Sequence, residues 1–251
     1  MTARLYLHEV RTQQRLFWRS YEAAFFTFLL PILFLVLIGS LYGDSTLDGI
    51  KGSTFLLAGM IGYSIAAGAF AGLAISVVIR RESGVLKRVR GTPLPPWIGL
   101  SAVITSTMIV IGLNVVIQLL IGRFALDAGM PQSVWSFILT LVVGVAAFAA
   151  LGLAITTAVR SAEGSSAIVN AIYLPMVFLS GSFFSTESLP AVLDAISAVL
   201  PLTFALELLR DTFVSGETVA DHPGDLVGLL LWGFFGLIVA LRAFRWEPQE
   251  A

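Results

Sequence analysis

The sequence predicts an all-α integral membrane protein with six transmembrane helices, and two observations support this fold class. Of the 251 residues, 57% are hydrophobic and only 12% are charged. Soluble domains carry about 25% charged residues, so we expect lipid to surround most of this chain. The second observation is that the apolar residues are gathered into long runs separated by polar loops.

Six apolar runs are close to the roughly 20 residues that a helix needs to cross a bilayer. They are Ala23–Tyr42, Thr54–Ile79, Ile98–Ile121, Val134–Val159, Ala167–Phe184 and Leu226–Leu241. In lipid, every backbone polar group must be hydrogen-bonded within the protein, so all six runs are expected to be helices. Residues 1–251 then form a single transmembrane domain.

The basic residues are unevenly divided between the two sides that six crossings create. Twelve of the fifteen Lys and Arg residues fall on the side of both termini: Arg4, Arg11, Arg15, Arg19, Arg80, Arg81, Lys87, Arg88, Arg90, Arg160, Arg242 and Arg245. The other side has Lys51, Arg123 and Arg210. Basic loops stay in the cytoplasm, so we expect a multi-pass protein of the cell membrane with both termini cytoplasmic.

Residues 1–22 precede the first run and predict a helix that lies in the membrane interface. Four arginines share one stripe of this helix: Arg4, Arg11, Arg15 and Arg19. The opposite stripe is apolar and aromatic: Tyr6, Val10, Phe17 and Tyr21. Such a helix lies at the level of the lipid headgroups, with its arginines toward anionic lipid or a cytoplasmic partner. The alternative is a plain basic anchor that only fixes the orientation of the chain.

A charged loop over residues 80–97, RRESGVLKRVRGTPLPPW, separates the second and third runs. Residues 81–90 can form a short helix, and the prolines that follow end it. We expect this loop to take mechanical work from a partner outside the membrane. Ordinary retention of positive charge is one alternative, and binding of anionic lipid is another. Nucleic acid is disfavoured because the basic patch is small and closely flanked by membrane spans.

Two polar or small-residue patterns lie inside the predicted spans. Ser64, Gly68, Gly72 and Ser76 recur every four residues in the second run, which favours close helix packing within one chain or across a dimer. Asn114 and Gln118 lie one turn apart in the third run. Such groups either bond across helices or line a pathway, and the sequence leaves both alternatives open.

The segment over residues 187–213 is apolar but interrupted by Pro190 and Pro201, and it carries the charged residues Asp194, Glu207, Arg210 and Asp211. Each half is too short to cross a bilayer, so we expect a re-entrant or interfacial segment on the outer side. Counting it as a seventh span would place Arg242 and Arg245 outside.

Several functional classes lack their sequence signals here. The chain has no cysteine, and neither of its lysines follows a glycine as a P-loop requires. His8 and His222 fall on opposite sides, so we expect no histidine-based metal or nucleophile site. No Asp, Glu, Lys or Arg lies within the six runs, whereas ion-coupled transporters keep such groups near the midplane. We therefore expect neither an enzyme nor a cofactor or metal in this chain, and a transport cycle powered from elsewhere.

The chain resembles the permease subunits of bacterial type 2 ABC exporters, the group that contains daunorubicin-type drug exporters and polysaccharide exporters. The resemblance covers nearly the whole chain and rests on the amphipathic segment 4–21, on the 80–97 loop and on LPLTFALELLRD before the last run. The loop matches the family pattern E-x-G-x-L-x-R-x-x-x-T-P through Glu82, Gly84, Leu86, Arg88, Thr92 and Pro93.

The resemblance implies that the 80–97 loop forms a coupling helix that docks on a separate ATP-binding cassette subunit, which holds ATP and Mg. The partner contacts would come from Arg81, Glu82, Gly84, Leu86, Lys87, Arg88, Arg90, Thr92 and Pro93. It also implies a second permease chain, identical or related, with the second and fifth spans lining a central path. Candidate path residues are Tyr63, Phe70, Asn114, Gln118, Asn170, Tyr173 and Phe178.

The expected function is that of a membrane-spanning permease subunit of an ATP-driven exporter. Because the expected path has no fixed charge, we expect amphipathic, drug-like or lipid-like cargo. One alternative is a polysaccharide or glycolipid export permease. A further alternative is a membrane protein without a transport cycle or an intramembrane enzyme, although the acidic residues such an enzyme needs for metal and phosphate are scattered.

Overall fold

The computed structural model describes residues 2–43, 45–47, 49–91, 95–159, 161–185, 190–214 and 218–243. This part of the chain consists of helices and one β-hairpin with two residues in each strand. In chain order the elements are α1 (Thr2–Arg19), α2 (Tyr21–Tyr42), β1 (Thr46–Leu47), β2 (Ile50–Lys51), α3 (Gly52–Ile65), the π-helix η1 (Ala66–Gly72), α4 (Leu73–Glu82), α5 (Val85–Arg90), α6 (Pro96–Ala125), α7 (Val134–Ile155), α8 (Ala162–Leu179), α9 (Ala191–Ser197), α10 (Pro201–Val214) and α11 (Pro223–Ala243). In the hairpin, Thr46 pairs with Lys51 and Leu47 with Ile50, antiparallel.

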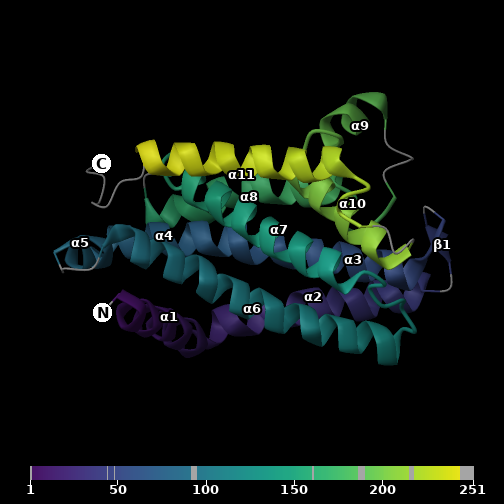
Figure 1. Ribbon diagram of the computed structural model, residues 1–251, viewed down its shortest axis with the longest axis horizontal. Coiled ribbons are helices and arrows are strands. Elements are labelled where there is room, and N and C mark those ends of the chain that lie inside the picture. Colours follow the sequence, from purple (N-terminus) through teal and green to yellow (C-terminus); the bar gives the residue numbers. More distant parts are fainter. Residues whose placement is uncertain are drawn as a thin grey trace.

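The long helices lie side by side along one axis of the molecule (Figure 1). The start of α1, the whole of α5 and the end of α11 lie at one end of this bundle, and the β-hairpin and α9 lie at the other. The described chain therefore starts and finishes at the same end, as an even number of crossings requires. We call the end with α1 and α5 the α5 end, and the opposite one the hairpin end.

The prediction of an all-α membrane protein is confirmed. Among the described residues, six helical segments are long and apolar enough to cross a membrane: Tyr21–Tyr42, Gly52–Glu82, Trp97–Ala125, Val134–Ile155, Ala162–Leu179 and Pro223–Ala243. Each coincides with one of the six apolar runs. The second is continuous through α3, η1 and α4, and it is the most buried of the six, so it forms the centre of the bundle.

Glycines allow close contacts between neighbouring helices of the bundle. A Cβ at Gly152 of α7 would lie 2.8 Å from the backbone oxygens of Ala69 and Phe70 in η1. A Cβ at Gly236 of α11 would lie 2.7 Å from the backbone nitrogen of Leu151 in α7. These crossings allow backbone-to-backbone contact, which is how membrane helices pack without help from the hydrophobic effect.

The π-helical turn at Ala66–Gly72 was not predicted from the apolar run, which indicated a regular helix. A π-helical turn widens the backbone and displaces its carbonyls, and such turns are frequent at functional positions. Here the displaced carbonyls of Ala69 and Phe70 face Gly152, so the widened turn and the glycine on α7 fit one another.

The small residues of the second span face other helices of the same chain and a partly open cavity. A Cβ at Gly68 would lie 3.2 Å from the Ile111 side chain of α6, and Ser64 is hydrogen-bonded to Gln118 on that same helix. Gly72 and Ser76 line a cavity between helices. Of the two alternatives, packing within one chain accounts for Ser64 and Gly68.

α9 and α10 are bent by 79° at a short break that ends at Pro201. The first N–H group of a helix has no acceptor within the helix, so proline, which lacks this group, is well suited to the first position of α10. Neither half is long enough to cross a bilayer alone. A re-entrant placement of this pair on the outer side remains a prediction.

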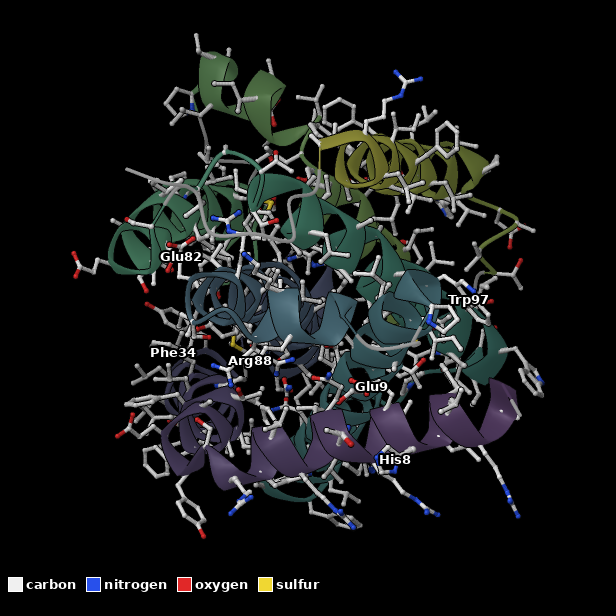
Figure 2. All side chains as sticks on the ribbon, turned by 90° about the vertical axis from the view of Figure 1, so that its left-hand side faces the viewer. His8, Glu9, Phe34, Glu82, Arg88 and Trp97 are labelled. Atoms are coloured by element: carbon white, nitrogen blue, oxygen red, sulfur yellow. The ribbon has the colours of Figure 1, made fainter. Side chains whose placement is uncertain are left out.

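α1 runs across the α5 end of the bundle, seen along the long axis in Figure 2. Its four predicted stripe arginines are exposed, and Val10 on the opposite side is buried. The Tyr6 hydroxyl lies 2.6 Å from Thr105 Oγ1 of α6. Tyr21 belongs to α2 and is 82% exposed, because α1 ends at Arg19. That α1 lies in the headgroup plane remains a prediction.

The contact between Gly152 and the π-helical turn can be tested with an alanine. We expect Gly152→Ala to lower the free energy of unfolding by about 1–3 kcal/mol, because its Cβ must displace backbone atoms rather than a flexible side chain. Gly112→Ala on α6 is the matched control, since a Cβ there meets nothing within 4 Å. In a helix interior it should stabilise by about 0.5–1 kcal/mol. Equal thermal stability of the two variants in detergent would refute the close contact.

Candidate functional site

The junction between α4 and α5 is a tight turn that depends on one glycine. Gly84 has φ +70°, a conformation that side chains other than glycine rarely adopt. Its N–H donates to the Arg81 carbonyl at 3.0 Å, and its carbonyl accepts from the Arg88 N–H at 3.2 Å. The glycine of the E-x-G pattern therefore sets the direction in which α5 leaves the end of the second span.

Arg81 is the most consequential residue of this junction, and it points inward. It is 1% exposed. Its Nη1 donates to the Thr156 carbonyl at 2.9 Å and its Nη2 to the Val159 carbonyl at 2.5 Å. These carbonyls follow the last turn of α7, where backbone oxygens lack helical partners and a cation is favoured by the helix dipole. Nε faces Glu82 Oε1 at 3.3 Å.

This placement corrects the expectation that Arg81 contacts a partner. The side chain is fully used inside the chain, where it fastens the end of the second span to the segment between α7 and α8. The sequence grouped Arg81 with the other four basic residues of the loop, because an arginine next to a membrane span is ordinarily exposed. Glu82 shares in this arrangement, with its side chain 23% exposed.

α5 presents two different faces. Leu86 packs against the hydrophobic core, and this holds the short helix to the bundle. Val85, Lys87 and Arg88 are exposed. Figure 2 shows Glu82, Arg88 and Trp97 at this end of the molecule. The exposed face of α5, formed by Val85, Lys87 and Arg88, therefore combines one apolar and two basic side chains at the end of the bundle.

The remaining predicted partner contacts are only partly described. Gly91 closes α5 with its N–H directed at the carbonyls of Lys87 and Arg88, both at 3.2 Å. The side chain of Arg90 and residues Thr92 and Pro93 lie outside the described residues. Their role in partner docking stays a prediction.

The predicted path residues divide into an aromatic group and a buried group. The tyrosine rings of Tyr63 in α3 and Tyr173 in α8 lie 6.0 Å apart. Phe183, just after α8, lies 5.9 Å from Tyr63 and 5.4 Å from Phe178. Phe34 of α2 completes the group at 5.7 Å from Phe183. We call these five residues the aromatic cluster. It joins α2, α3 and α8. The sequence did not indicate Phe34, which lies in a run not expected to line the path, or Phe183, which shares the fifth run with Tyr173 and Phe178.

Phe70 and Asn170 do not belong to the aromatic cluster. Phe70 is buried in the hydrophobic core, where its backbone meets Gly152. Asn170 lies half-buried on α8. Phe178 is 50% exposed, so the aromatic cluster reaches the surface of the chain at α8.

Asn114 and Gln118 form a polar connection between helices. Both are fully buried. Gln118 Nε2 donates to Ser64 Oγ at 2.8 Å and to Asn114 Oδ1, while Asn114 Nδ2 donates to the Thr27 carbonyl at 2.8 Å. α2, α3 and α6 are thereby tied together. The structure thus favours packing over pathway for these two residues, which were predicted as path candidates.

A second group of ionisable residues lies at the hairpin end. Ligand atoms of Asp211, His222 and Asp225 all lie within 4.8 Å of one another, close enough to hold one metal ion. His222 Nε2 is 3.6 Å from Asp211 Oδ2. Burial, together with Asp225 and Asp211, raises the pKa of nearby Glu207 to about 7. The sequence did not indicate this group, because its two histidines fall on opposite sides, whereas α10 and the start of α11 bring His222 to two carboxylates.

Another ion pair at this end joins the β-hairpin to the segment after α6. Lys51 Nζ of β2 lies 2.8 Å from Asp127 Oδ2, after α6, and the hydrogen bond from Lys51 lowers the pKa of Asp127. Arg123 Nη1 lies 3.5 Å from the same carboxylate. Lys51 and Arg123 thus both form ion pairs with Asp127 at the hairpin end.

Comparison with known proteins gives a family and several relatives. A family model described as "ABC-2 type transporter" matches residues 6–214. The chain is 25% identical over 228 residues to "Putative transport permease YvfS" of Bacillus subtilis, covering 89% of each. It is 32% identical over 99 residues to "Nodulation protein J" of Rhizobium leguminosarum bv. viciae, covering 38% of each. It is also 32% identical over 68 residues to "Probable multidrug ABC transporter permease YbhS" of Escherichia coli, covering 27% of this chain and 18% of that one.

The Arg81 contacts predict a loss of stability that an exposed arginine does not share. Arg81→Gln leaves the Thr156 and Val159 carbonyls without their charged donor, and we expect the free energy of unfolding to fall by about 2–3 kcal/mol. Arg88→Gln on the exposed face of α5 is the control and should change it by less than about 0.5 kcal/mol. Thermal unfolding in detergent measures both. Equal stabilities would show that Arg81 does not fasten the junction.

Proposed function

Because this chain belongs to the ABC-2 type transporter family and is a multi-pass membrane permease subunit, we propose that a separate ATP-binding cassette subunit docks on α5 and drives export through it. The observation that carries this proposal is the geometry of the α4–α5 junction. α5 lies at the end of the bundle with exposed basic side chains. Its Leu86 packs against the core, and Arg81 fastens the end of the preceding helix, α4.

The junction is suited to transmit a push from outside the membrane. Gly84 sets the angle between α4 and α5, and the Arg81 hydrogen bonds prevent the end of α4 from sliding past α7. A force on α5 therefore moves α4 as a unit with its neighbours. The π-helical turn η1 directly precedes α4 in the same span. Because π-helical turns are common sites of helix kinks, we expect the span to bend there.

ATP supplies the energy by changing which arrangement is more stable. ATP and Mg would bind to the partner subunits, and closure of those subunits would favour one tilt of α4 over the other. With both termini in the cytoplasm, as the distribution of basic residues indicates, the α5 end faces the cytoplasm. The outward direction of transport rests on the resemblance to type 2 ABC exporters.

The aromatic cluster supports an amphipathic cargo. Tyr63, Tyr173, Phe34, Phe178 and Phe183 offer apolar rings with two phenolic hydroxyls and no formal charge. Drug-like and lipid-like molecules combine an apolar body with a few polar groups and match such a surface. The relative YbhS, described as a probable multidrug ABC transporter permease, is compatible with this class of cargo.

A second permease chain would complete the path. The aromatic cluster reaches the surface of one chain, and the outer faces of α2 and α8 carry exposed apolar residues, including Leu33 and Leu37 on α2 and Ile172 on α8. Two chains that meet along these faces would enclose the two aromatic clusters between them. A pathway shielded from lipid requires such a partner, identical or related to this chain.

Charge reversal on α5 tests the proposed docking. We expect the double variant Arg88→Glu/Arg90→Glu to abolish transport and co-purification of the ATP-binding subunit, because the charge of the proposed docking segment is then reversed. Insertion into the membrane should be unchanged. Arg123→Glu at the hairpin end is the matched control and should leave co-purification intact, since its side chain is 53% exposed at the opposite end. Normal co-purification of the double variant would contradict docking at α5.

A further inference from the structure

A cavity of about 530 Å³ lies beside α1 at the α5 end, away from the aromatic cluster. Its walls come from α1, α2, η1, α4 and α6. This volume falls within the roughly 300–1,000 Å³ of typical ligand sites. The space is only partly enclosed by these helices, so a ligand can enter it from outside the chain.

The second span forms one wall of the cavity with both small and large side chains. Gly68, Gly72 and Ser76 line it together with Leu73, Ile75 and Ile79. Val103 and Val110 of α6 and Leu16 of α1 supply apolar surface on the other sides. In a membrane, hydrocarbon chains fill such an apolar space at no cost in hydration, because lipid tails are as apolar as leucine side chains.

α1 is held in place along one side of this cavity. Gln14 Nε2 donates to the Ser106 carbonyl at 2.9 Å and to Ser106 Oγ at 3.0 Å. The polar groups of Gln14 and Ser106 are therefore satisfied by each other rather than by a ligand. The Thr27 hydroxyl donates to the Ala23 carbonyl at 2.7 Å. These contacts leave the interior of the cavity predominantly apolar.

One cation lines the cavity at its end. Arg80 lies in the last turn of α4, at the α5 end, and is half-buried. Its Nη1 donates to Gln13 Oε1, a neutral amide, and Gln13 in turn donates to Glu9 Oε1 at 2.7 Å. The Glu9 carboxylate is thus bound to the amide, and it attracts the guanidinium electrostatically without a direct ion pair. A planar guanidinium with five N–H donors is well matched to a phosphate group.

We infer that this cavity binds an anionic membrane phospholipid, with one acyl chain between α1 and the second span and the phosphate at Arg80. Charge complementarity and the apolar interior select this occupant. An arginine near the end of a membrane helix extends toward the headgroups, where the phosphate of an anionic lipid lies. Such a lipid would lie against α4 and so against the segment that joins the coupling helix to the membrane. The leaflet to which this lipid belongs depends on the proposed orientation of the chain, but the binding does not.

The test is lipid binding to the purified chain, measured by native mass spectrometry in detergent without any partner subunit. Palmitoyl-oleoyl phosphatidylglycerol should bind about fivefold more tightly than the phosphatidylcholine with the same tails. Arg80→Gln should remove this preference. Val103→Phe, which fills the cavity from α6, should weaken the binding of both lipids. Glycerol phosphate alone should not bind, because the acyl chain is part of the site.

Arg11→Gln is the matched control, since Arg11 is exposed on α1 outside the cavity and should not affect the preference by more than twofold. Gel filtration and helical content establish that each variant is folded. If Val103→Phe does not fold, Ser76→Leu serves in its place, because it fills the cavity from the opposite wall. The proposal is overturned if Arg80→Gln retains the preference, if Arg11→Gln loses it equally, or if a folded cavity-filling variant binds lipid as the original chain does. None of these outcomes depends on ATP or on export.

Discussion

The mechanical account of this chain depends on the hydrogen bonds between the Arg81 guanidinium and the carbonyls of Thr156 and Val159. A buried charge is costly unless it is fully hydrogen-bonded, and here the donors meet backbone oxygens that the end of α7 leaves without partners. Neither side is satisfied without the other. The end of the second span is therefore joined to the α7–α8 connection, and the exposed face of α5 extends from a fixed base.

The rest of the bundle allows that base to move as a unit. Above α4 the backbone widens into the π-helical turn η1, against which Gly152 packs without a side chain. Further along the same span, Ser64 is tied through Asn114 and Gln118 to α2 and α6. The second span is thus fastened at the α5 end, widened at η1 and joined to other helices by polar groups nearer the hairpin end. The cavity at Arg80 borders α4 and η1, so its occupant would contact the part of the span that is proposed to move.

The sequence predicted the spans well because bilayer thickness and backbone hydrogen bonding leave few alternatives, and all six runs became helices. It also located α5, since prolines and a glycine limit the helix on both sides. It did not predict the inward turn of Arg81, because loop charges are ordinarily exposed and the receiving carbonyls lie more than seventy residues away. Asn114 and Gln118 were ambiguous for the same reason. The π-helical turn, the group formed by Asp211, His222 and Asp225, and the cavity at Arg80 all depend on tertiary contacts that no local pattern encodes.

The most direct test of the central claim is a distance between the α4–α5 junction and the α7–α8 connection. The chain has no cysteine, so cysteines introduced at Ser83, which lies just before α5 and outside the proposed docking face, and at Ser161 can be spin-labelled specifically, because both positions are exposed. Pulsed electron resonance on the complex should give one narrow distance distribution that stays unchanged between nucleotide-free and ATP-bound states, and Arg81→Gln should broaden it. A distribution that shifts with ATP in the original chain, or one that Arg81→Gln leaves narrow, would contradict the claim that Arg81 makes this junction rigid.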